Sequence, residues 1–266
     1  MFSALFNRRP PLNERSIRWL FDAYGWAFRN LSGSIFHLQT QLVLADDAHF
    51  PVEVQSVQGR AELIFYKAAE YAGMSHWPWQ VLDSTHYHLR AQVVPPRGAG
   101  QAFHGAHRLK LDAALPIVYE ARLVASREVL VASFSRMLAE YLVRGLGELP
   151  PGGAPRWSHG IDLVAIFMGF GVIYANSLPL FLRGAALDIR GDRLVEEDHL
   201  SRWDAAYALA IFCALKKIPR RDVLPHLKRP LRGFFNRAVS DVAMRKRELQ
   251  ALHDLSDPVI LERNRA

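Results

Sequence analysis

The stretch LVASFSRMLAEYLV, residues 130–143, predicts an apolar helix that carries two opposite charges. Its apolar stripe, at helical spacing, consists of Leu130, Phe134, Met137, Leu138, Tyr141 and Leu142. Arg136 and Glu140 are four residues apart, so their side chains can meet as an ion pair. Burial of this pair would make the loss of either partner cost about 3–5 kcal/mol. An unrelated amphipathic helix with one salt bridge would have the same pattern.

The composition is that of a globular protein with a sizeable core. The chain has 266 residues, of which 50% are hydrophobic and 22% charged. Its single cysteine, Cys213, lies in an apolar run, which excludes an intramolecular disulfide and a cysteine-based metal cluster. The N-terminal residues contain no apolar core and cleavage site typical of a secretory signal. Together these features predict a cytoplasmic protein.

The order of helical and extended patterns predicts an α+β fold in one domain, residues 1–266. Residues 1–125 supply helices at 13–31 and 59–73 and strands at 79–94 and from Pro116 to Val124. Residues 126–182 form a helix pair joined by the loop PPGGAP, and residues 183–266 form C-terminal helices. Ser201 and Asp204 resemble a capping box at the start of one of them.

Residues 163–182 form an uncharged run, LVAIFMGFGVIYANSLPLFL. Its length approaches the roughly 20 residues of a membrane span. Asn176, Ser177 and Pro179 interrupt the run, and a central helix of a large domain is equally apolar on all sides. We therefore expect a buried helix, with membrane contact as the alternative. The glycines of GFG, 169–171, are interpreted as small residues that allow close helix packing.

Three segments resemble an uncharacterised family of bacterial proteins with a zincin-like, gluzincin-type metallopeptidase core. They are LVASFSRMLAEYLV, the helix IDLVAIFMGFGVIYANS at 161–177, and the C-terminal stretch DAAYALAIFCALKKIPRRDVLPHLKRPLRGFF at 204–235. In H-E-x-x-H enzymes two histidines four residues apart bind zinc, and the intervening glutamate activates water. The resemblance implies a small mixed sheet, this helix pair and a helical C-terminal half, with zinc in the intact relatives.

The resemblance also implies that the metal motif is replaced in this chain. Arg136 stands at the first histidine, Met137 at the catalytic glutamate and Glu140 at the second histidine. Ser158 stands where a third-ligand glutamate is expected, and Asp162 matches the aspartate of the family. Arginine has no lone pair for zinc, and methionine cannot act as a base. We expect no zinc, no catalytic residues and a binding or regulatory role, as in other pseudoenzymes.

Histidines elsewhere leave a metal-dependent hydrolase open as an alternative. His86 and His88 would share one face of a strand, a spacing that metal sites use. His159 lies nearest to the replaced motif and could join Glu140 and Asp162 in a relocated site. No acid or cysteine completes the strand pair at a diagnostic spacing.

The charge of +7 leaves a third reading open. Eleven basic residues and only two acids lie between Lys216 and Arg247, which would suit nucleic acid or an anionic membrane. Few aromatic residues accompany them, and Phe234 and Phe235 are spaced like core residues. A solvated face of C-terminal helices is the simpler interpretation, and a protein is the expected partner.

Overall fold

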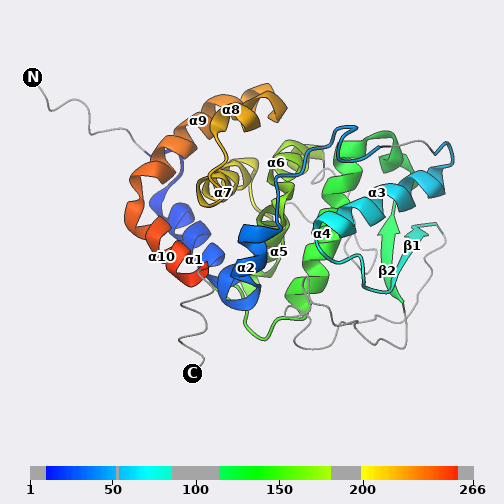
Figure 1. Ribbon diagram of the computed structural model, residues 1–266, viewed down its shortest axis with the longest axis horizontal. Coiled ribbons are helices and arrows are strands. Elements are labelled where there is room, and N and C mark those ends of the chain that lie inside the picture. Colours follow the sequence, from blue (N-terminus) through cyan, green and yellow to red (C-terminus); the bar gives the residue numbers. More distant parts are fainter. Residues whose placement is uncertain (1–9, 52–53, 86–113, 181–198, 257–266) are drawn as a thin grey trace, which may run out of the picture.

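The computed structural model describes residues 10–51, 54–85, 114–180 and 199–256 (Figure 1). Helices dominate these residues and accompany one small parallel sheet, so the predicted α+β class is confirmed at this level. The sheet pairs β1 (Trp79–Asp83) with β2 (Leu115–Tyr119), in a register that places Trp79 beside Leu115 and Asp83 beside Tyr119. It lies at one end of the molecule, next to α3 (Val57–Tyr71).

The N-terminal helices begin at the side chains that the sequence indicates. Asn13 accepts a hydrogen bond from the Ser16 amide at 2.8 Å and starts α1 (Glu14–Asn30). The short helix α2 (Gly33–Leu38) follows. The predicted helix at 59–73 starts earlier, because Ser56 caps α3 by accepting from the Gly59 amide. Gly73 follows the helix with a φ of 67°, as its position predicted.

Both predicted strands were too long within the described residues. β1 ends at Asp83, whose carboxylate accepts from the amide and hydroxyl of Thr85 in a turn. Residues 86–94 of that prediction lie outside the described residues. β2 ends at Tyr119 and gives way to a 3₁₀ helix, Ala121–Ala125, which buries Leu123 and Val124. A short apolar run fits a strand and a 3₁₀ turn equally well, which explains the error.

The helix quoted at the start, α4 (Arg127–Arg144), lies at the centre of the fold. Every residue from Val129 to Val143 is buried, so no face of the helix meets solvent along this length. It contacts α3 on one side, and on the other α5 (Trp157–Ala165) and α6 (Gly171–Leu180) (Figure 1). Burial on all faces explains why the chain can hold a charge pair here only if the charges neutralise each other.

The C-terminal helices pack around α7 (Arg202–Leu215), which is capped by the predicted reciprocal hydrogen bonds of Ser201 and Asp204. The segment continues through α8 (Arg220–Val223), a 3₁₀ turn at Leu224–His226, α9 (Arg229–Met244) and α10 (Lys246–Ser256). α9 packs on α7, and α10 lies against α1 (Figure 1). Phe234 and Phe235 are buried, as their spacing predicted.

The apolar run forms a broken helix rather than a straight one. Ala154–Leu178 is long and apolar enough to cross a membrane, and its apolar window is entirely buried inside the described protein. A π turn, Ile166–Phe170, separates α5 from α6, and Gly169 within it has a φ of 100°. The Gly169 carbonyl accepts from the Val43 amide at 3.0 Å. Only Gly171 fits the packing role that the sequence suggested, because it meets Leu209 of α7.

Gly169→Ala should destabilise the protein by about 3 kcal/mol or more, since left-handed strain adds to a steric clash. A Cβ at this position would lie 2.0 Å from the carbonyl oxygen of Gln41. Gly233→Ala, at an exposed position of α9, is the matched control, because a Cβ there meets nothing within 4 Å. The control should stabilise by about 0.5–1 kcal/mol. Chemical denaturation measures both, and equal stabilities would contradict this account.

Candidate functional site

A buried ion cluster occupies the position where the replaced metal motif was inferred. Arg136 Nη1 lies 3.2 Å from Glu140 Oε2, which confirms the predicted pair within α4. Arg136 Nε lies 3.4 Å from Asp162 Oδ1 on α5. The side chains of Arg136 and Glu140 are 2% and 3% exposed, and that of Asp162 is 0% exposed. The guanidinium thus joins the two helices through their carboxylates.

Arg144 is the second arginine that the described residues bring to this cluster. Glu140 Oε1 accepts from Arg144 Nη2 at 2.8 Å and from Nε at 3.1 Å. Among the described residues, Arg136 and Arg144 thus place two positive charges beside the negative charges of Glu140 and Asp162. Buried charges are tolerated when they are paired and hydrogen-bonded in this way.

Among the described carboxylates, Asp162 accepts the most hydrogen bonds. Its Oδ2 accepts from the Leu200 amide at 2.9 Å and from His199 Nδ1 at 3.0 Å. The Tyr174 hydroxyl of α6 donates to Oδ1. Burial raises the pKa of Asp162, but His199, Arg136 and the Tyr174 hydroxyl together hold that pKa below its ordinary value. The group is therefore an ionised acceptor, and it fixes the start of the chain leading into α7.

His199 and Tyr174 were missed by the sequence analysis. They lie 37 and 12 residues from Asp162, and neither spacing carries a motif that could have marked them. Because ionised Asp162 only accepts hydrogen bonds, His199 Nδ1 carries a proton. An aspartate that orients a histidine also occurs in catalytic triads. The His199 side chain is only 1% exposed, so it meets no substrate in this arrangement.

The other two positions of the replaced motif do not join the cluster. Met137 is fully buried in the apolar core around α4. Ser158 is half-buried near the start of α5, and among the described residues its side chain makes no hydrogen bond to Arg136, Glu140 or Asp162. The five sequence-predicted positions therefore divide into a three-residue ionic cluster, one core residue and one peripheral residue.

His159 contacts Arg156, and not Glu140 or Asp162, the two acids with which it was proposed to form a relocated metal site. Arg156 Nη1 lies 2.8 Å from His159 Nε2, and a guanidinium only donates, so Nε2 is an acceptor. Burial, and then Arg156, lower the pKa of His159.

Across the described ranges, no group of three histidine, cysteine or acidic side chains is placed to hold a metal ion. His86 and His88 lie outside the described residues.

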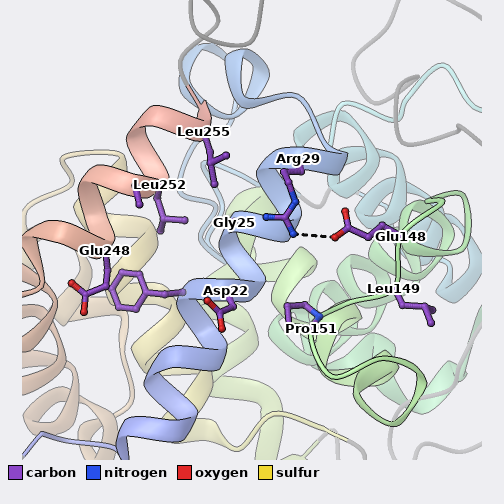
Figure 2. A pocket seen from close by; sticks show the side chains of 11 residues that line it. Asp22, Gly25, Arg29, Glu148, Leu149, Pro151, Glu248, Leu252 and Leu255 are labelled. Atoms are coloured by element: carbon purple, nitrogen blue, oxygen red, sulfur yellow. Dashed lines mark hydrogen bonds and ion pairs between the residues drawn. The ribbon is translucent and has the colours of Figure 1, made fainter. Parts of the chain in front are cut away.

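Two cavities flank the glycine- and proline-rich connector between α4 and α5. One, of about 480 Å³, lies between α1 and α10, and Figure 2 shows Leu252 and Leu255 of α10 facing it. The Arg29–Glu148 ion pair, 3.0 Å long, borders this cavity. The other, of about 520 Å³, includes Trp19 and His159 in its lining. The indole of Trp19 donates to the Pro151 carbonyl at 2.7 Å, which ties α1 to the connector.

Several basic residues of the C-terminal helices hold the fold together. Lys216 donates to the carbonyls of Phe36 and His37, at the end of α2. Arg245 bridges Asp241 and Glu14, which joins α9 to α1. Lys228 pairs with Glu128, and Arg232 donates to the carbonyls of Leu227 and Pro225. These internal contacts reduce the number of basic groups left for an anionic partner.

Arg136→Gln should lower the free energy of unfolding by about 3–5 kcal/mol, because it leaves Glu140 and Asp162 as under-compensated buried charges. Arg29→Gln removes an arginine from a pair whose side chains are 47% and 48% exposed. That control should cost at most about 1 kcal/mol. Urea denaturation compares the two variants, and a loss of similar size would show that the buried cluster is not a stabilising network.

Arg156→Gln should raise the pKa of His159, measured by NMR titration of its ring. Arg18→Gln, at an exposed position of α1, should leave that pKa unchanged. Since the pKa of folded His159 lies below the ordinary value of 6.5, the unfolded chain binds the proton at higher pH. The contribution of neutral His159 to the free energy of unfolding is fully present above its pKa in the unfolded chain. It is lost as the pH falls toward its pKa in the folded protein. Arg156→Gln should therefore also weaken this acid sensitivity; an unchanged His159 pKa would contradict the assigned contact.

Comparison of the chain with protein-family models, curated proteins and solved structures found no match. The resemblance to zincin-like proteins therefore rests on the three sequence segments alone. The candidate site rests on the contacts of the described residues. Its distinctive feature is a buried cluster of paired charges that spans α4, α5, α6 and the residues before α7.

Proposed function

We propose that this protein is a catalytically inactive, zincin-like protein with a binding or regulatory role. The observation that carries the proposal is the buried Arg136 guanidinium between Glu140 and Asp162. Its position corresponds to the first metal-binding histidine in the motif that the chain resembles. A permanent cation there opposes the charge of a divalent metal, and it supplies no lone pair.

The remaining chemistry also favours a protein without peptidase activity. Met137 offers no group that could take a proton from water. Glu140 has both carboxylate oxygens committed to arginines, Oε2 to Arg136 and Oε1 to Arg144. A metal at this place would have to displace a guanidinium from two buried carboxylates. The cluster instead suits a structural role, in which it holds α4 and α5 in a fixed relation.

The cavities at the surface of this scaffold support a binding role. The cluster is closed to solvent, whereas the connector between α4 and α5 is flanked by two cavities. We propose a protein as the partner and the cytoplasm as the location. The location is in keeping with a single thiol, Cys213, whose pKa burial raises to about 12. A thiol of that kind is inert to oxidation and metal binding at neutral pH.

Purified, tag-free protein should contain no stoichiometric zinc, should take up none in a titration monitored by calorimetry, and should not cleave an unstructured protein substrate. The physical reason is the permanent positive charge of Arg136 beside Glu140 and Asp162, the two acids of the cluster among the described residues. Elemental mass spectrometry and melting with and without a chelator measure the first point. One equivalent of zinc whose removal lowers the melting temperature would overturn the proposal.

Two variants separate the alternatives within this test. Zinc that is lost in His159→Gln would identify a relocated metal site. Replacement of Arg136 and Glu140 by His, and of Met137 and Ser158 by Glu, rebuilds the complete motif. Zinc binding by that variant would support zincin-like ancestry. A folded variant that fails to bind zinc would count against the ancestry.

A further inference from the structure

The cavity of about 520 Å³ beside His159 brings together side chains from three separate parts of the chain. α1 contributes Arg15, Ser16 and Trp19, and the residues at the start of α5 contribute Arg156 and His159. Asp204 comes from the first turn of α7. A cavity of this size falls within the range of about 300–1,000 Å³ that small-molecule sites occupy.

The charges of the cavity favour an anion. Among the described residues, neither Arg15 nor Arg156 has a carboxylate partner, and both are exposed. Among the described lining residues Asp204 is the one acid, and its Oδ2 accepts from the Ser201 amide at 3.2 Å and hydroxyl at 2.6 Å. Two arginines and one acid thus line the described part of the cavity. Arginine binds carboxylate and phosphoryl groups through paired N–H donors.

The contacts of Arg156 hold one of these guanidiniums in place. Its Nη1 donates to His159 Nε2 at 2.8 Å, and its centre lies 6.0 Å from the centroid of the Trp19 ring. Because Nε2 accepts, His159 is neutral and Nδ1 carries the hydrogen. His159 therefore does not add a second fixed charge that would repel Arg156. The Trp19 ring is itself fixed by its bond to Pro151, so the aromatic wall beside the guanidinium is rigid.

Helix ends add to the positive potential of the cavity. Asn13 caps α1, Arg156 is at the start of α5, and Ser201 precedes α7, so the N-termini of three helices adjoin the cavity. α5 begins without a side-chain cap, which leaves its first amides without a side-chain acceptor. Helix N-termini carry partial positive charge and favour anions. This effect supports the arginines and would not define a site without them.

We propose that this cavity binds a small organic anion, with a carboxylate or phosphoryl group between Arg15 and Arg156 and a planar or apolar part against Trp19. This proposal goes beyond the inactive-enzyme assignment and does not depend on it. The cavity also connects to the buried cluster, because Leu200 lines it while its amide donates to Asp162. Leu200 therefore lies between the cavity and the buried cluster.

The test titrates isotope-labelled full-length protein with inorganic phosphate and, separately, with benzoate, at constant ionic strength maintained with chloride. The signals followed are the Trp19 indole N–H and the His159 ring. Saturable shifts with at least one probe are expected. Arg15→Gln and Arg156→Gln should each weaken binding about tenfold. Arg18→Gln removes the same charge from the same helix outside the cavity and should leave affinity unchanged.

The outcomes separate the two ligand classes. Binding of phosphate alone would assign a phosphoryl ligand, and binding of benzoate alone would assign a carboxylate. Shifts that match those of a chloride titration, or that are the same in wild type, Arg15→Gln and Arg156→Gln, would overturn the proposal. All three arginines are exposed, so the variants should fold, and their melting temperatures check this. Failure here leaves the zinc experiment unaffected, so the two proposals can be rejected separately.

Discussion

The ionised carboxylate of Asp162 is the interaction on which the arrangement of the central helices depends. It lies on α5, yet its partners come from α4, α6 and the segment before α7, through Arg136, Tyr174 and His199. An uncompensated charge at such depth would cost several kcal/mol, so the four elements must meet in one geometry for the fold to be stable. The polar contacts therefore specify the packing that the surrounding apolar side chains drive.

The bend between α5 and α6 shapes the region around Asp162. α5 and α6 cannot continue as one straight rod, because Gly169 adopts a backbone conformation that favours glycine. At the bend the backbone of Gln41 packs against Gly169, and the Val43 amide donates to the Gly169 carbonyl. It also lets Tyr174 on α6 reach back to Asp162 on α5. A long apolar run thus becomes a bent core element that supports a polar cluster.

The surface cavities near the connector differ in chemistry from the buried cluster around Asp162. Inside, the described charges are paired and closed to solvent. Outside, the connector between α4 and α5 separates the cavity near Leu252 from the cavity near Arg156. Trp19 and Trp26 of α1 both donate to carbonyls of this connector, which anchors it to the helical body. Both of these cavities lie beside the connector, whereas the Arg136 cluster is closed to solvent.

Local sequence patterns were sufficient to predict the elements that depend on neighbouring residues. Helical periodicity predicted α1, α3 and α4, and the side chains of Asn13 and Ser201 fixed helix starts through bonds within three residues. The spacing of Arg136 and Glu140 likewise predicted their pair. Only the tertiary structure decided the partners of Asp162, because His199 lies 37 residues away and no short pattern joins them. It also decided the bend at Gly169, which depends on a carbonyl from Gln41, and the meeting of Arg15 with Arg156 at one cavity. Contacts between distant segments depend on packing of the whole chain, and local spacing cannot encode them.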